Sequence, residues 1–346
     1  MTRTALLICP GRGTYTKTEL GYLARHHADK RPLLDHFDAM RAALGQDTLT
    51  ALDTAPSYSV ARHTRGDNAS ALIYAATLAD FQSINRDDIE IVAVTGNSMG
   101  WYSALACGGA LTPENGFQVV NTMGTLMQQK LIGGQTVYPF LGEDWAANPA
   151  KQAELLTLIA QINTRKDHTL ALSIALGGML VIAGNDAGLT AFEAAVPPLN
   201  RFPMRLANHA AFHTALQAPV AEAGRAALPQ SLFQQPTLPL IDGRGAIWWP
   251  GATDPAKLRD YTLGHQVTQA YDFTHAIRTG LREFAPDIVI VTGPGTTLGG
   301  AVAQSMVLAN WQGLATKEDF QTMQANTPRL VAMGMDDQRL SVTAKG

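Results

Sequence analysis

The sequence predicts an α/β fold in which helices cross between the strands of a mostly parallel sheet. Three short apolar runs carry this prediction, and each ends at glycine or proline: Ala5–Cys9, Ile89–Thr95 and Asp287–Thr292. Near-continuous apolar runs of this length are typical of strands that are buried on both faces of a parallel sheet. Long stretches with helical periodicity separate the runs, as crossover connections between parallel strands require.

Three of these stretches are long enough to be complete helices. Apolar residues recur at helical spacing in Asn68–Ile84, Pro113–Leu131 and Asp260–Phe284. The chain beyond about residue 315 has weaker patterning, and we expect it to wrap the surface.

The region after Leu131 has a different pattern, which predicts a small inserted α+β unit. A polar helix is expected at Asn148–Asn163 and a second helix at Ala187–Val196. Between them, Thr169–Ala175 and Met179–Ala183 flank Gly177-Gly178 and predict a β-hairpin, and a short segment follows near Met204–Ala207. We therefore expect a small subdomain at 133–206 and a large one formed by 1–132 and 207–346.

Composition excludes several classes of protein. Of the 346 residues, 46% are hydrophobic and 16% charged, with a net charge of −3, so a large core is expected and a nucleic-acid partner is not. No apolar run is long enough for a membrane helix, and the N-terminal run before Pro10 is too short for a secretory signal. The two cysteines, Cys9 and Cys107, lie in apolar segments, which favours a reducing compartment. We expect a cytoplasmic protein without a membrane partner.

The strongest chemical signal is a serine between an expected strand and an expected helix. Gly96-Asn97-Ser98-Met99-Gly100 matches G-x-S-x-G, directly after the run Ile89–Thr95. Glycines on both sides permit the sharp turn that presents such a serine at a helix N-terminus, where free N–H groups favour developing negative charge. The pattern predicts that Ser98 is a nucleophile and that the backbone N–H of Met99 is an oxyanion donor.

A serine nucleophile needs a base, and the chain has nine histidines. His209 and His213 lie at the expected start of a helix, where sites are often built. The residues alone do not choose between these two histidines.

Two glycine loops do not match nucleotide-binding motifs. Gly11-Arg12-Gly13 lacks the Lys-Ser/Thr of a P-loop, and Gly293-Pro294-Gly295 is followed by Leu298 where G-x-G-x-x-G requires glycine. We expect both loops to turn the chain at the ends of strands, where open α/β sheets place their sites.

Taken together, four motifs in order resemble those of malonyl-CoA:acyl carrier protein transacylases and of the acyltransferase domains of polyketide and fatty-acid synthases. The chain has Cys9-Pro10-Gly11-Arg12-Gly13 for F-P-G-Q-G, Gly96–Leu105 for G-H-S-x-G-E-Y-S-A-L, Ala211–Leu216 for A-F-H-S-x-L and Thr292–Leu298 for V-G-P-G-x-x-L. The resemblance implies an α/β-hydrolase-like core with a ferredoxin-like insert.

The resemblance also implies roles for individual residues. Ser98 is then the nucleophile, His213 its base, and Gln266 orients the histidine through its backbone carbonyl. The backbone N–H groups of Arg12 and Met99 form the oxyanion hole. Asp242 and Asp272 remain open as alternative third members.

Three positions that are expected to contact substrate depart from the family's pattern, and a fourth, Phe212, matches it. Asn97 replaces a histidine and Trp101 replaces a glutamate or similar residue, while Phe212 beside His213 is expected to narrow the pocket. Met123 replaces the arginine that binds the free carboxylate of malonyl groups in the family. Because an unpaired buried carboxylate costs several kcal/mol, we expect a neutral acyl group such as acetyl or propionyl. The alternative is that Arg12 binds a malonyl carboxylate from the opposite wall.

The function expected from these residues is ping-pong transfer of an acyl group from acyl-CoA to the phosphopantetheine thiol of an acyl carrier protein, in fatty-acid or polyketide synthesis. No metal or tightly bound cofactor is expected, and acyl-CoA is the donor substrate. Two alternatives stay open: a serine hydrolase that uses the same Ser98 and His213, and a non-catalytic docking scaffold. Basic residues near the insert, such as Arg165, Lys166, Arg201 and Arg205, either meet an acidic carrier protein or form an ordinary solvated face.

Overall fold

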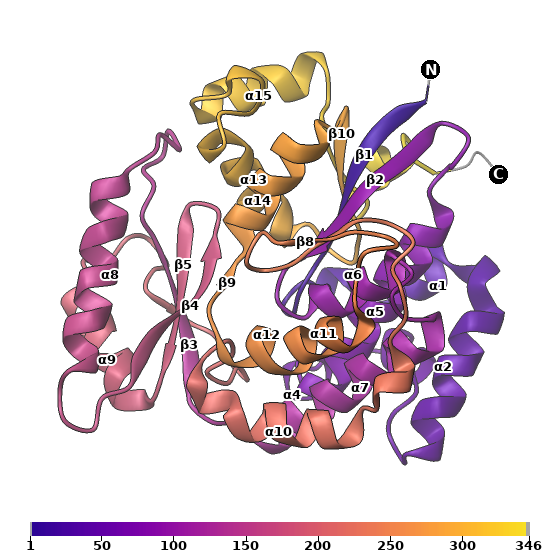
Figure 1. Ribbon diagram of the computed structural model, residues 1–346, viewed down its shortest axis with the longest axis horizontal. Helices are drawn as coiled ribbons and strands as arrows, with labels where there is room; N and C mark the ends of the chain where they lie inside the picture. The colour runs from indigo at the N-terminus through magenta and orange to yellow at the C-terminus, as the bar shows by residue number, and fades with distance from the viewer. Residues whose placement is uncertain (1, 344–346) are drawn as a thin grey trace.

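The computed structural model describes residues 2–343, which build two sheets with helices packed around them (Figure 1). The larger sheet has six strands in the order β11-β10-β1-β2-β7-β8, and all neighbouring pairs are parallel except β7 and β8. Its strands are β1 (Arg3–Cys9), β2 (Ile89–Gly96), β7 (Leu240–Ile241), β8 (Ile247–Trp248), β10 (Ile288–Val291) and β11 (Leu330–Ala332). The prediction of a parallel α/β core is confirmed.

Helices cover both faces of this sheet. On one face lie α5 (Gly66–Ser83), α6 (Gly100–Cys107) and α7 (Pro113–Gln129), and on the other lie α13 (Phe273–Phe284) and α14 (Thr297–Leu308) (Figure 1). The apolar run of β1 is buried from Ala5 to Cys9, which explains why its residues do not alternate with polar ones. The predicted helices at 68–84 and 113–131 correspond to α5 and α7.

The remaining helices of the large part have between 3 and 13 residues, and most of them were not predicted. They are α1 (Tyr22–His26), α2 (Arg31–Ala43), α3 (Leu49–Asp53), α4 (Val60–His63), α10 (Ala218–Ala227), α11 (Pro255–Asp260), α12 (Gln266–Thr268), α15 (Lys317–Asn326) and α16 (Asp336–Arg339). Several span only one turn, too short for a periodic pattern to stand out.

The smaller sheet has five strands in the order β6-β3-β5-β4-β9, and α8 (Pro149–Asn163) and α9 (Asp186–Ala195) pack against it. Its strands are β3 (Gly134–Pro139), β4 (Leu170–Leu176), β5 (Met179–Gly184), β6 (Met204–Arg205) and β9 (Tyr271–Asp272). The predicted hairpin is β4 and β5, and the two predicted helices are present. Strand β9 joins this sheet from outside the predicted range 133–206, whose exact limits stay a prediction.

The prediction of one continuous helix over Asp260–Phe284 is wrong. After α11 the chain forms a π-helical turn at Tyr261–His265 and the short α12, and then extends into β9 before α13 begins. Tyr271 breaks the helix because it pairs with Ile174 of β4 and its hydroxyl donates to the carbonyl of Gly96. Tertiary contacts therefore override the helical pattern on either side.

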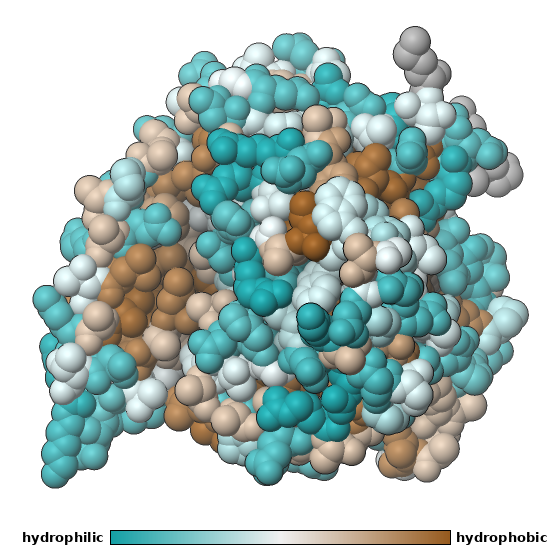
Figure 2. Space-filling model, viewed as in Figure 1, coloured by the Kyte–Doolittle hydropathy of each residue, from teal (hydrophilic) through white to brown (hydrophobic). Residues whose placement is uncertain are grey.

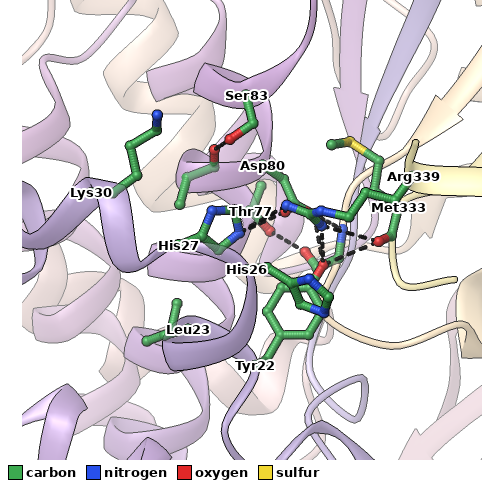
Figure 3. Close-up of polar contacts among 12 residues, drawn as sticks. Tyr22, Leu23, His26, His27, Lys30, Thr77, Asp80, Ser83, Met333 and Arg339 are labelled. Carbon is green, nitrogen blue, oxygen red and sulfur yellow. Dashed lines mark hydrogen bonds and ion pairs between the residues drawn. The ribbon is translucent and has the colours of Figure 1, made fainter. Parts of the chain in front are cut away.

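The expectation that the chain beyond residue 315 wraps the surface is also wrong for part of that segment. Strand β11 is buried and extends the parallel sheet beside β10. The following α16 is anchored by Arg339, whose guanidinium pairs with the buried carboxylate of Asp80 at 2.6 Å. Asp80 also accepts hydrogen bonds from Tyr22 and His27, so a buried polar cluster joins α1, α5 and α16 (Figure 3).

Within residues 2–343, no helix is both long enough and apolar enough to cross a membrane. Figure 2 shows hydrophobic side chains gathered over the small sheet, in the left half of the view, beside the more polar surface of the large part.

Candidate active site

Ser98 lies in a strained turn between β2 and α6. Its φ is +56°, a left-handed conformation that is uncommon outside glycine. The two flanking glycines are sterically required: a Cβ on Gly96 would lie 2.2 Å from the carbonyl oxygen of Gly100, and one on Gly100 would lie 2.2 Å from that of Cys9. The turn therefore lets α6 approach β1 closely and leaves the Ser98 side chain half-buried at the helix start.

Ser98 and His213 are brought together across 115 positions of sequence. The Oγ of Ser98 lies 2.7 Å from Nε2 of His213, within hydrogen-bond distance. His213 also has a positive φ, +57°, in the loop before α10. A hydroxyl hydrogen-bonded to an imidazole is the arrangement that lets the imidazole accept the serine proton.

The other ring nitrogen of His213 is held by a backbone carbonyl. Nδ1 lies 2.6 Å from the carbonyl oxygen of Gln266, and because a carbonyl only accepts, Nδ1 carries the proton and Nε2 is left as the acceptor. The Gln266 side chain reaches Ser98 as well: its Nε2 donates to the Ser98 carbonyl at 3.0 Å, while Tyr102 donates to its Oε1 at 3.1 Å. Gln266 thus stabilises the turn that carries Ser98 through its side chain and orients the His213 imidazole through its backbone carbonyl.

Burial keeps His213 neutral. Loss of solvent lowers the pKa of His213 to about 4, although the hydrogen bond to the Gln266 carbonyl partly opposes this shift. The imidazole is therefore in its basic form at neutral pH.

Two backbone N–H groups are free beside the serine. One belongs to Met99, the N-cap residue of α6, and the other to Arg12 in the loop after β1. Among residues 2–343, neither N–H group has a hydrogen-bond acceptor. The Arg12 loop lies against the nucleophile turn, since a Cβ on Gly11 would come within 2.5 Å of the Asn97 carbonyl oxygen. Free amides in this position suit an oxyanion.

A cavity of about 300 Å³ opens next to Ser98, between the two sheets. The small sheet supplies an apolar wall that includes Val137, Ile174, Met179 and Val181, and α14 supplies Leu298. The polar side chains of the lining include Arg12, Asn97, Gln135 and His209. The cavity therefore combines a reactive end with a long apolar wall, as ligand sites commonly do.

Arg12 lies in this lining with its guanidinium largely withdrawn from solvent. Its Nη2 donates to the carbonyls of Thr64 and Asn208, and its guanidinium carbon lies 5.4 Å from the centre of the Phe212 ring. Nε and Nη1 are buried and have no partner within the described residues. Burial lowers the pKa of Arg12 to about 10, which leaves the side chain charged at neutral pH.

Of the predicted substrate contacts, Asn97 and Phe212 line the cavity, whereas Met123 and Trp101 do not. The side chains of Met123 and Trp101 are fully buried in the core. Met123 packs against α10, where a Cβ on Gly224 would lie 2.6 Å from its sulfur, and Trp101 donates from Nε1 to Thr262 at 3.0 Å. Their helices turn these two side chains inward, and direct substrate contact by them stays a prediction.

Neither aspartate that was left open as a third member contacts His213. Asp242 accepts hydrogen bonds from Arg244 and Trp248, and Asp272 caps α13 by accepting from the backbone N–H of His275.

Within residues 2–343, no group of three or more histidine, cysteine, aspartate or glutamate side chains has metal-ligand geometry.

Sequence reasoning missed several residues that support the site. Tyr102 and Tyr271 bond to Gln266 and Gly96, and Gln135 and Ser173 of the small sheet connect to the loop that carries His213. Tyr102 belongs to the motif around Ser98 and could have been noticed, but the others lie in segments without a motif.

No family model matches the chain. Among curated proteins, it is 25% identical over 305 residues to a malonyl CoA-acyl carrier protein transacylase of Haemophilus influenzae, covering 85% of this chain and 89% of that one. It is also 32% identical over 186 residues to a phenolphthiocerol/phthiocerol polyketide synthase subunit of Mycobacterium tuberculosis, covering 53% of this chain but only 10% of that much longer protein.

Solved structures share the fold over nearly the whole length. A malonyl-CoA:acyl carrier protein transacylase of Synechocystis superposes with a TM-score of 0.74 at 19% identity, covering 99% of this chain and 100% of that one. A malonyl-transacylase in complex with a type II polyketide acyl carrier protein gives a TM-score of 0.72 at 19% identity, covering 98% of both chains. The resemblance drawn from the four motifs is confirmed, and so is the prediction of an enzyme of the acyltransferase class.

Proposed function

We propose that this relative of the malonyl-CoA:acyl carrier protein transacylases moves an acyl group from acyl-CoA to the phosphopantetheine thiol of an acyl carrier protein, through an ester on Ser98. The observation that carries the proposal is the hydrogen-bonded pair of Ser98 and His213, whose tautomer is fixed by the Gln266 carbonyl, at the end of a mostly apolar cavity.

The reaction has two balanced half-reactions. His213 Nε2 takes the proton of Ser98 as Oγ attacks the thioester carbonyl carbon, and the Arg12 and Met99 amides stabilise the oxyanion. The carbon–sulfur bond breaks, and the imidazolium returns its proton to the leaving thiolate of coenzyme A. The carrier thiol then loses its proton to His213 and attacks the ester carbonyl carbon of the acyl-serine. The ester carbon–oxygen bond breaks, and the imidazolium returns the proton to Ser98 Oγ, which restores the alcohol.

Intact-protein mass spectrometry with a panel of acyl-CoAs tests this proposal. We expect a mass increment of one acyl group, absent in Ser98→Ala, and at least ~10³-fold slower acylation in His213→Ala. Addition of a holo acyl carrier protein should move the increment to the carrier. Release of free acid at the same rate with and without carrier would instead identify a hydrolase, and no increment with any acyl-CoA would support a non-catalytic scaffold.

We propose a neutral acyl group as the preferred cargo. Met123 is turned into the core, so α7 offers no cation to the cavity, and the wall formed by the small sheet is apolar. A free carboxylate placed against such a wall would lose its hydration without compensation. Acetyl- or propionyl-CoA should therefore load Ser98 faster than malonyl-CoA at equal concentration.

A carboxylated acyl group is the second candidate, and one observation favours it. The buried guanidinium of Arg12 has two nitrogens without partners, and a carboxylate would supply them. Arg12→Gln decides between the candidates because it keeps the backbone N–H. If Arg12 binds a carboxylate, malonyl loading should fall about 100-fold while acetyl loading is unchanged; if the cargo is neutral, the ratio of the two rates should stay constant.

An acyl carrier protein is proposed as the acceptor because it presents the same thiol-bearing arm as coenzyme A. Arg201 is exposed and belongs to the cavity lining, where its charge would attract the phosphates carried by both thiols. Of the three other basic residues noted near the insert, Arg205 is already paired with Asp186 and Glu193, and Arg165 and Lys166 do not belong to the cavity lining. Phosphate attraction is therefore assigned to Arg201 rather than to the whole set.

A further inference from the structure

A second imidazole, that of His209, lies in the lining of the same cavity as Ser98. The proposed mechanism does not use it, since the imidazole at the Ser98 hydroxyl is that of His213. Its Nδ1 lies 2.8 Å from Oε1 of Gln135 on β3. Within residues 2–343, Nε2 of His209 makes no hydrogen bond, so the other edge of the ring is available to a ligand.

A chain of hydrogen bonds fixes which nitrogen of His209 carries the proton. Ser173 on β4 lies 2.8 Å from the backbone carbonyl of Phe212, and because a carbonyl only accepts, the Ser173 hydroxyl must donate to it. The same hydroxyl oxygen then accepts from Nε2 of Gln135 at 2.7 Å. The Gln135 amide is thereby oriented with Oε1 toward His209, so Nδ1 of His209 is the donor and Nε2 holds a lone pair.

The surroundings keep this second imidazole uncharged. Burial and the neighbouring Arg12 cation lower the pKa of His209 to about 3. The ring is therefore neutral at neutral pH, and the lone pair on Nε2 can accept a hydrogen bond. What His209 offers to the cavity is therefore a fixed, neutral acceptor beside a cation.

We propose that His209 is a positioning residue that accepts a hydrogen bond from an amide N–H of the pantetheine arm shared by acyl-CoA and the acyl carrier protein. This inference rests on the proposed function. A neutral acyl group such as acetyl has no N–H or O–H to donate, whereas the arm carries secondary amides and enters the cavity in both half-reactions. Gln135, Ser173 and the carbonyl of Phe212 hold the acceptor in place.

The test uses three acetyl donors that differ in amide content, with the purified full chain. They are S-acetylpantetheine, S-acetyl-N-acetylcysteamine, and S-acetyl-2-mercaptoethyl acetate, in which an ester oxygen replaces the amide N–H. The rate of Ser98 acylation is measured by mass spectrometry in the wild type, in His209→Leu and in His209→Gln. We expect His209→Leu to lower kcat/KM for the pantetheine donor about 10-fold, through KM, and to leave the ester donor within about twofold.

The variant His209→Gln is the matched control, because its side-chain oxygen can replace the acceptor and should restore part of the preference for amide donors. A merely structural role would slow all three donors equally, and that result would overturn the inference, as would unchanged rates for all three in His209→Leu. Failure of the wild type to acylate Ser98 with any donor or acyl-CoA would instead contradict the proposed function itself, and the inference with it.

Discussion

At the scale of single residues, His213 is the group whose environment most directly sets the chemistry. Its imidazole is buried, donates to the Gln266 carbonyl and faces Ser98, and burial lowers its pKa to about 4. Because the protonated form cannot accept the Ser98 proton, kcat/KM for acylation should be flat above about pH 5 and fall with a midpoint near 4. Single-turnover acylation followed by mass spectrometry across this range checks the profile.

The same shift predicts how stability depends on pH. The pKa is lower in the folded than in the unfolded chain, so the unfolded state binds more protons between about pH 6.5 and 4. This contribution to the free energy of unfolding is complete above that window and is lost as the pH falls through it.

For the activity profile, a midpoint of kcat/KM near pH 6.5 instead of 4 would show that the His213 imidazole is solvated in solution.

Met123 gives a second prediction at this scale. An arginine here would restore the family's pattern, but the side chain is fully buried against Gly224 of α10. Met123→Arg should therefore bury an unpaired cation and destabilise the fold by about 3 kcal/mol or more, without faster malonyl loading. Urea denaturation checks the stability, with Gln129→Arg at the exposed end of α7 as the control. Stable protein with increased malonyl loading would mean that the helix can present this position to substrate.

The site residues were predictable to different degrees, for physical reasons. Ser98 was found because a tight turn forces glycine at Gly96 and Gly100, which leaves a visible motif. The residues alone did not separate His213 from His209, since both lie in one loop and only tertiary contacts give them different partners. Whether Met123 and Trp101 line the cavity could not be read from a motif, because a motif fixes a position along a helix but not the packing of its side chain.

At the scale of elements, the close approach of α6 to β1 is what presents the serine. A Cβ on Gly100 would lie 2.2 Å from the Cys9 carbonyl oxygen, which is backbone and cannot move aside cheaply. Gly100→Ala should therefore destabilise the protein by at least about 2 kcal/mol and reduce Ser98 acylation. Thermal unfolding and acylation rates measure both effects.

Gly300 in α14 provides the matched control for this substitution. It lies on an exposed helix position with nothing within 4 Å of an added Cβ, so Gly300→Ala should stabilise the protein by about 0.5–1 kcal/mol through helix propensity. If both variants had the same stability as the wild type, the contact between α6 and β1 would not be tight.

Elements were predicted well where local pattern and tertiary environment agree. The buried run of β1 and the long α5, which is buried along most of its length, are of this kind. The segment 260–284 was predicted wrongly as one helix, because its break at Tyr271 depends on pairing with β4. Asp272, which caps α13, is a local start signal that could have divided the segment.

At the scale of the whole molecule, the parallel core and the inserted unit followed from the sequence, whereas the placement of the C-terminal segment did not. Strand β11 is only three residues long, and no local pattern shows that it pairs with β10. What holds the segment that follows is Arg339, whose partners Asp80 and Tyr22 are more than 250 positions away in sequence. Contacts of this range leave no periodic signal.

This cluster should contribute strongly to global stability (Figure 3). The carboxylate of Asp80 is fully buried and accepts from Tyr22, His27, Arg339 and the backbone N–H of Gly293, whose loop leads to the cavity-lining Leu298. Asp80→Asn keeps the shape but leaves Arg339 without a counter-ion, so the free energy of unfolding should fall by about 3–5 kcal/mol. Urea denaturation measures this, and hydrogen exchange should show faster opening of 330–343.

The control for this last prediction is an ion pair on the surface. Asp35 pairs with Arg31 on α2, and both side chains are more than half exposed, so Asp35→Asn should cost at most about 1 kcal/mol. Equal losses in the two variants would mean that the buried carboxylate contributes no more than a solvated one. A large loss in the free energy of unfolding confined to Asp80→Asn, with faster hydrogen exchange at α16, would support the prediction. One buried charge would then connect the C-terminal segment to the core and to the loop beside the cavity.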